Sequence, residues 1–226
     1  HWTPGGPELP GKPPATPSRP ESKGSGFVRA RETWAQSGVM NTPALLAAMT
    51  GQRPDHHPVW FMRQAGRSLP EYRAAREGTT MLQSCLTPDL AAEITCQPVR
   101  RHKVDAAVLY SDIMVPLALA GVGVHIEPGV GPVVDEPVRT AADVAKLTSI
   151  PAGDAAVVEQ EAKLVVDELG ETTPLIGFAG APFTIAAYLV AGRPSRDHLA
   201  ARAMMHSDPQ AWGELMDWVA PVSYTH

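Results

Sequence analysis

Two arginines four positions apart, Arg63 and Arg67, stand directly after an apolar run in the segment PVWFMRQAGR, residues 58–67. A guanidinium group binds carboxylates and phosphates through paired hydrogen bonds, so two of them at the end of a strand could hold an anionic ligand. Gly66 gives this loop the freedom to turn its neighbours inward. The alternative is a pair of solvated arginines, the usual state of charged side chains.

Two further segments also place polar or small residues after an apolar run. Asp112 follows DAAVLYS, where its carboxylate either caps a helix, is satisfied within the core, or accepts hydrogen bonds from a ligand that carries N–H groups. The segment GFAGAP, residues 177–182, fits either a phosphate-binding loop or a tight turn between strand and helix, because it matches neither GxGxxG nor a P-loop. Tyr188 lies on the next predicted helix and belongs either to the core or to a cleft.

The elements that must position these residues alternate between helix and strand. Nearly continuous apolar runs predict strands at 58–62, 106–111 and 174–178. An extended arm with a turn is predicted at 124–134. Helices are predicted at 41–51, 69–78, 87–102, 140–147, 154–170, 182–192, 195–206 and 208–220. Within the helix at 87–102, Pro98 is expected to kink or shorten the end. This alternation is typical of a parallel sheet covered on both faces, and ligands bind at the carboxyl ends of its strands. Three strands are too few for a closed barrel.

Composition excludes several classes of function. The chain of 226 residues is 44% hydrophobic with a formal net charge of -5, so it has no general attraction for nucleic acid or anionic membranes. It has neither an apolar run of the ~18 residues typical of a membrane span nor the pattern of a signal peptide. Cys85 and Cys96 lack CxxC spacing, which favours a reduced, cytoplasmic protein. The histidines show no metal-binding spacing, and no metal site is assigned.

The two ends of the chain differ from its middle. Residues 1–26 are crowded with Pro, Gly and Ser and cannot bury enough surface to offset the entropy of ordering. The first methionine is Met40, so residues 1–39 are interpreted as a disordered, non-native extension and residues 40–221 as the folded part. Residues 222–226 are interpreted as a non-native tail after a truncation.

Long motifs in the folded part resemble a known family. The segments PVWFMRQAGRSLPEYR and PLIGFAGAPFTIAAYLVAG are similar to the two signatures of the uroporphyrinogen decarboxylases, and VDAAVLYSDIMVP and EPGVGPVVDEPVR also match. The similarity runs from about Asn41 to about Val219. One departure is Ser68, where many members have tyrosine, and it is expected to alter local packing without changing the anion site.

The resemblance implies a (β/α)₈ TIM barrel, incomplete in this fragment, that forms a homodimer when full length and needs no cofactor. It implies decarboxylation of the four acetate side chains of uroporphyrinogen III, giving coproporphyrinogen III in haem synthesis. The matching positions make Arg63 and Asp112 catalytic, with Asp112 accepting hydrogen bonds from pyrrole N–H groups, and Tyr188 lines the cleft. The resemblance implies that the substrate-binding residues are Arg63, Gln64, Ala65, Gly66, Arg67, Asp112 and Tyr188.

Two other readings stay open. A corrinoid- or thiol-directed methyltransferase shares the barrel, but it requires zinc ligands and does not account for the intact RQAGR and YSD segments. An inactive fragment is the other reading. The 226-residue chain is itself expected to be inactive and poorly folded alone, because an unclosed barrel exposes sheet edges and core.

Overall fold

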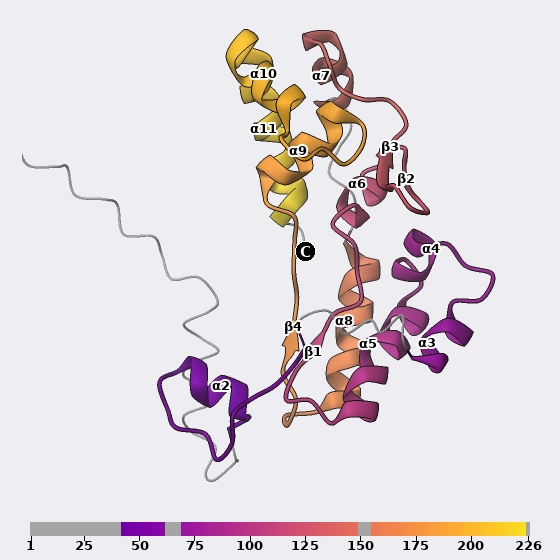
Figure 1. Ribbon diagram of the computed structural model, residues 1–226, viewed down its shortest axis with the longest axis vertical. Coiled ribbons are helices and arrows are strands. Elements are labelled where there is room, and N and C mark those ends of the chain that lie inside the picture. Colours follow the sequence, from indigo (N-terminus) through magenta and orange to yellow (C-terminus); the bar gives the residue numbers. More distant parts are fainter. Residues whose placement is uncertain (1–41, 62–68, 149–154, 225–226) are drawn as a thin grey trace, which may run out of the picture. The chain divides into compact units, whose positions relative to one another are not determined.

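The computed structural model describes residues 42–61, 69–148 and 155–224 (Figure 1). The helices within these ranges are α2 (Ala44–Met49), α3 (Pro70–Ala75), α4 (Met81–Cys85), α5 (Pro88–His102), α6 (Val115–Leu119), α7 (Ala141–Thr148), α8 (Ala156–Leu169), α9 (Pro182–Ala191), α10 (Leu199–Ser207) and α11 (Pro209–Tyr224). The strands are β1 (Ala107–Val108), β2 (Val124–Glu127), β3 (Gly131–Val134) and β4 (Leu175–Ile176). The described chain therefore combines helices with short strands, but it does not alternate strictly, because α2 to α5 all precede β1 and α9 to α11 all follow β4.

The central strands β1 and β4 pair in parallel, with Ala107 opposite Leu175 and Val108 opposite Ile176. This pairing confirms the parallel sheet, although both strands are shorter than the predicted 106–111 and 174–178. Helix α5 precedes β1 and α8 precedes β4, and these two helices pack along each other beside the strands (Figure 1). The arrangement brings the residues that follow β1 and β4 to the same edge of the sheet.

The predicted first strand, 58–62, lies partly outside the described residues at Met62, and its described part has no strand assignment. It is nevertheless held next to the start of β1. The Asp105 N–H donates to the Val59 carbonyl at 2.8 Å, and the Val59 N–H donates to Asp105 Oδ2 at 2.7 Å. His56 Nε2 lies 2.6 Å from the other oxygen of the same carboxylate. Asp105 thus fixes this segment through its side chain as well as its backbone.

Two apolar clusters form the core. One lies among α3, α4, α5, β1 and α8 and includes Ile94, Tyr110 and Val165. The other is built mainly from α6, α7, α9, α10 and α11 and includes Leu189 and Leu215. The chain passes from the first cluster to the second just after β1, because Tyr110 belongs to the first cluster and Met114 to the second.

The hairpin of β2 and β3 is antiparallel, with Val124 opposite Val134, and it corresponds to the predicted arm at 124–134. Its turn uses Gly129 and Gly131, both with positive φ. A Cβ atom on Gly131 would lie 3.2 Å from Cγ of Pro194, so the hairpin packs closely against the loop that follows α9. The backbone N–H of Val134 also donates to the carbonyl of Gly192 at 2.9 Å.

Several predicted helix ends differ from the structure. Helix α5 continues through the buried Pro98 to His102, so the expected shortening is wrong. Thr87 precedes α5 without a side-chain cap to it, and the Thr87 hydroxyl donates to the Gln83 carbonyl at 2.8 Å. Helices α4 and α6 were not predicted. Helix α11 extends beyond residue 220 and buries Val222 and Ser223.

Some expectations lie outside the described residues. These are the extension at 1–39, the RQAGR segment, Ser68 and the last two residues of the proposed tail. Within residues 42–61, 69–148 and 155–224, no helix is long and apolar enough to cross a bilayer. In the same ranges, no three His, Cys, Asp or Glu side chains are grouped as metal ligands would be. Both cysteines are buried free thiols.

Candidate active site

Asp112 is half-buried at the point where the chain leaves the β1 segment and turns into α6. Its Oδ1 accepts a hydrogen bond from the Met114 N–H at 2.9 Å, and its carbonyl accepts one from the Val115 N–H at 3.0 Å. The carboxylate is therefore oriented by the backbone of the turn that it closes. Asp112 is not the N-cap of α6, because that position is Met114 and the helix has no side-chain cap. The contact with the Met114 N–H instead holds the Asp112 carboxylate in a defined direction at the strand end.

The turn after Asp112 meets the loop that follows β4. A Cβ atom on Gly180 would lie 3.3 Å from Cβ of Ile113, and it would lie 2.5 Å from Cδ1 of Ile185 on α9. A side chain at position 180 would therefore force Ile113 and Ile185 to shift. Of the two readings of GFAGAP, the tight turn explains Gly180 directly, and it brings two of the three predicted strand ends together.

Tyr188 lies in the second turn of α9, where its half-buried side chain packs against the cluster of α6, α7, α9, α10 and α11. The same cluster contacts Ile113, the residue after Asp112. The backbone carbonyl of Tyr188 accepts from the Gly192 N–H at 2.8 Å, which closes the C-terminus of the helix. Tyr188 therefore belongs in part to the core, as one of its two sequence readings has it.

The strand end that carries Asp112 is anchored by hydroxyl groups from α4 and α5. The Tyr110 N–H donates to Oγ1 of Thr95 at 2.9 Å, and Thr95 in turn donates to the Ala91 carbonyl at 2.8 Å. The hydroxyl oxygen of Tyr110 lies 2.9 Å from Oγ of Ser84. Burial raises the pKa of the Tyr110 phenol, so it stays protonated and can serve as a hydrogen-bond donor. These contacts fix the backbone two residues before Asp112.

Sequence reasoning missed this anchor because it depends on α4, which was not predicted. The signal was present in the residues Thr80 and Gln83, which form a reciprocal capping box at the start of α4. A threonine followed three residues later by glutamine is the sequence pattern of a capping box, and it marks the N-terminus of a helix even when the helix is short. With α4 assigned, Ser84 becomes a candidate partner for a buried tyrosine.

A buried acid lies close to the same region. Glu161 on α8 is 1% exposed, and neither carboxylate oxygen has a hydrogen-bond partner within the described part of the chain. Burial raises the pKa of Glu161 to about 8. Burial also raises the pKa of Cys85 to about 12, and the Asp112 and Glu161 carboxylates add to the effect. The Asp112 and Glu161 carboxylates are therefore both close enough to the Cys85 thiol to raise its pKa.

The proposed anion-binding segment cannot be placed beside these groups. Arg63, Gln64, Ala65, Gly66 and Arg67 all lie outside the described residues. The flanking residues are described, and Val59 is hydrogen-bonded to Asp105 as given above. Of the predicted site residues, the structure therefore positions Asp112 and Tyr188.

Comparisons with known proteins agree with the motifs. The family profile described as Uroporphyrinogen decarboxylase (URO-D) matches residues 40–226. A protein named uroporphyrinogen decarboxylase from Arthrobacter sp. (strain FB24) is 61% identical over 179 residues, which cover 79% of this chain and 52% of the relative. One of the same name from Saccharopolyspora erythraea is 62% identical over 181 residues, covering 80% and 50%. One from Leifsonia xyli subsp. xyli is 57% identical over 192 residues, covering 83% and 51%.

The chain thus spans about half the length of the curated relatives that it matches. Among solved structures, a methyltransferase from Methanosarcina mazei superposes with a TM-score of 0.59 at 19% identity, covering 80% of this chain and 52% of that one. A structural match at such low sequence identity is evidence for the fold alone. Together with the family match, it confirms the predicted (β/α)₈ barrel class, of which this chain holds part.

Proposed function

The chain belongs to the uroporphyrinogen decarboxylase family, and from this premise we propose that the complete protein is a carboxy-lyase acting on uroporphyrinogen III. It removes carbon dioxide from the four acetate side chains and releases coproporphyrinogen III, a step of haem synthesis. The substrate is a cyclic tetrapyrrole that carries both carboxylates and pyrrole N–H groups. Its recognition requires cations around the rim of the site and an acceptor beneath the ring.

Asp112 is the acceptor in this proposal. Its Oδ1 is oriented by the Met114 N–H, and its half-buried position at the strand end limits solvent screening. A carboxylate in such a place is stabilised by ligand N–H groups and favours a positive charge on the macrocycle. This orientation of Asp112 is the single observation that carries the proposed function.

The chemistry proceeds through a protonated ring. A proton adds to a pyrrole carbon next to the acetate-bearing position, and the ring becomes a cation that can accept an electron pair. The bond between the acetate methylene and its carboxylate then breaks, carbon dioxide leaves, and the electron pair moves into the ring. A second proton adds to the methylene carbon to give a methyl group, and the ring loses the first proton. Asp112 stabilises the cation throughout.

Arg63 and Arg67 bind the substrate carboxylates in this proposal, and Gln64, Ala65 and Gly66 form the loop between them. Arg63 also assists proton transfer, although the high pKa of a guanidinium makes it a weak acid by itself. Tyr188 lines the cleft. The chemistry needs no metal or organic cofactor, because the substrate ring itself accepts the electrons.

The remaining features follow from the family. We propose that the complete protein is a homodimer and acts in the cytoplasm. Its two buried free thiols, Cys85 and Cys96, fit a reducing compartment. Nucleic acid is not a partner in this proposal, given a formal net charge of -5.

A direct assay tests the proposed function. Full-length protein is incubated anaerobically with chemically reduced uroporphyrinogen III, and the products are oxidised and separated by chromatography. Four successive losses of carbon dioxide, ending at the tetracarboxylate, support the proposal. Recovery of unchanged octacarboxylate under conditions in which a known decarboxylase turns over contradicts it. Methyl transfer from a methylated corrinoid to a thiol would instead establish the rival reading.

A further inference from the structure

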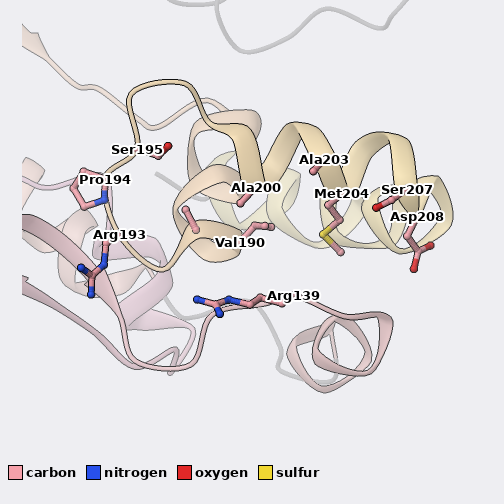
Figure 2. A pocket seen from close by; sticks show the side chains of 11 residues that line it. Arg139, Val190, Arg193, Pro194, Ser195, Ala200, Ala203, Met204, Ser207 and Asp208 are labelled. Atoms are coloured by element: carbon pink, nitrogen blue, oxygen red, sulfur yellow. The ribbon is translucent and has the colours of Figure 1, made fainter.

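Two arginines line a pocket at the C-terminal end of α9, away from the candidate active site. The pocket has a volume of about 560 Å³ and is bounded by the loop before α7, by the end of α9 and by one side of α10 (Figure 2). Helix α9 begins at the GFAGAP turn and runs from Pro182 to Ala191. At a rise of about 1.5 Å per residue, its two ends are roughly 15 Å apart. The pocket therefore lies at the other end of this helix from the turn next to Asp112.

Arg139 and Arg193 contribute the positive charge of this pocket. Within the described part of the chain, neither guanidinium has an ion-pair or hydrogen-bond partner. Both also line an adjoining pocket of about 400 Å³ on the hairpin side. In Figure 2 the side chain of Arg139 extends in the direction of Arg193. Two like charges that line one hollow and form no ion pair within the described residues favour the entry of an anion.

The backbone holds the two arginines in a fixed relationship. The Val138 N–H donates to the Leu189 carbonyl at 2.9 Å, and the Val134 N–H donates to the Gly192 carbonyl at 2.9 Å. One residue after Val138 stands Arg139, and one residue after Gly192 stands Arg193. These two main-chain hydrogen bonds join the segment before Arg139 to the end of α9, and so they restrict how far apart the two arginine backbones can lie.

Gly192 makes this close approach sterically possible. Its φ is +77°, and a Cβ atom there would lie 2.5 Å from Cγ of Pro137. The backbone N–H of Arg139 donates to Asp143 Oδ2 at 3.0 Å, which joins the arginine to the first turn of α7. The carboxylate of Asp143 thus contacts the main chain of Arg139 and leaves its guanidinium to the pocket.

The acids near the pocket already have partners. Asp208 lies at the opposite end of the pocket from Arg193 (Figure 2), and its Oδ1 accepts from the Ala211 N–H at 3.1 Å at the start of α11. On the hairpin side, Asp135 Oδ1 lies 2.9 Å from Nδ1 of His125. One oxygen of each carboxylate is thus engaged by another group, and within the described residues neither acid forms an ion pair with Arg139 or Arg193.

We propose that Arg139 and Arg193 form a second anion site, which binds a small organic anion such as a phosphate monoester or a carboxylate. The wall between the arginines and Asp208 is largely apolar and includes Val190, Ala200, Ala203 and Met204. The negative group lies between the guanidiniums and the organic part lies against this wall. A volume of this size is in the range of ordinary small-molecule pockets. The inference is independent of the proposed decarboxylation.

Calorimetric titration of the full-length protein tests this site, with phenyl phosphate and phenylacetate as probes and benzyl alcohol as the neutral control. Arg139→Gln and Arg193→Gln are each expected to weaken binding of the anionic probes roughly tenfold or more, because each removes a charge-assisted contact. Both side chains are exposed and unpaired within the described residues, so the variants are expected to keep the wild-type melting temperature.

Arg202→Gln is the matched control, because Arg202 is an exposed arginine on α10 that does not line either pocket. It makes the same change in net charge and is expected to leave binding within about twofold of wild type. Tighter binding of phenyl phosphate than of phenylacetate would identify phosphate monoesters as the ligand class, and the reverse would identify carboxylates. The absence of saturable binding, binding of benzyl alcohol with equal strength, or an equal loss in Arg202→Gln overturns the site.

Discussion

Gly180 and Ile113 approach so closely that a Cβ atom on the glycine would lie 3.3 Å from the Cβ atom of the isoleucine. The contact joins the loop after β4 to the turn after β1, and the second of these carries Asp112. Two segments more than sixty positions apart in the chain therefore share one edge of the sheet. The position of the Asp112 turn depends on the absence of a side chain at Gly180.

Gly180→Ala is expected to destabilise the protein by about 1–3 kcal/mol, because the new methyl group displaces both Ile113 and the side chain of Ile185. Gly177→Ala is the matched control in the same loop, since a Cβ atom there meets nothing within 4 Å. It is expected to change the free energy of unfolding by less than about 1 kcal/mol. Urea unfolding of both variants measures the difference, and equal effects would show that the close approach does not constrain the fold.

Asp112→Asn separates the structural role of this residue from its proposed chemical role. An amide oxygen can still accept from the Met114 N–H, so the turn and the melting temperature are expected to be retained. The negative charge is lost, and uroporphyrinogen turnover is expected to fall by about a hundredfold or more. Asp112→Ala should lose turnover and also some stability, because its turn loses a hydrogen bond. Near-normal turnover by the asparagine variant would remove the carboxylate charge from the mechanism.

The features of the fold that the sequence predicted correctly are those set by local signals. Helix α8 ends where Gly170 takes a positive φ, and α9 ends in the same way at Gly192, as the positions of these glycines indicate. The shortening expected at Pro98 does not occur, because α5 continues to His102. Proline removes one backbone donor, but Pro98 is buried and α5 packs along α8, and this packing offsets the local cost.

The site was less accessible from sequence, because its decisive contacts are long-range. Asp112 could be identified as the polar residue at the end of a strand, but its pairing with the Met114 N–H depends on the path of the turn. The packing of Gly180 against Ile113 could not be predicted from either segment alone. Likewise, the contact between Ser84 and Tyr110 requires α4 to be placed first.

Several apolar side chains near the strands of this partial barrel are exposed. Val59 is 43% exposed, Phe61 is 61% exposed and Phe178, which follows β4, is 45% exposed. We expect residues 42–224 expressed alone to bind a hydrophobic dye such as ANS strongly and to lack decarboxylase activity, whereas the full-length protein shows weak dye binding. A monomeric, active fragment with no dye binding would contradict this expectation.

The two cysteines are expected to resist alkylation in the folded protein. Burial raises the pKa of both Cys85 and Cys96 to about 12, so almost no thiolate is present at pH 8. Iodoacetamide treatment followed by peptide mapping should find both thiols unmodified, and both should be modified after unfolding in concentrated guanidinium chloride. Labelling of either cysteine before unfolding would show that its surroundings open readily.

Glu161 is expected to make the protein less stable as the pH rises. Burial raises its pKa to about 8 from an ordinary value of 4.5, so between these values the folded chain holds a proton that the unfolded chain releases. The free energy of unfolding therefore falls across this range, by an amount on the order of 3–5 kcal/mol. Glu161→Gln should abolish this decline, whereas Glu159→Gln, an exposed position on the same helix, should leave it unchanged. Urea unfolding at pH 5, 6, 7 and 8 measures the slope, and identical slopes for wild type and Glu161→Gln would mean that the carboxyl group is ionised and solvated in the folded protein.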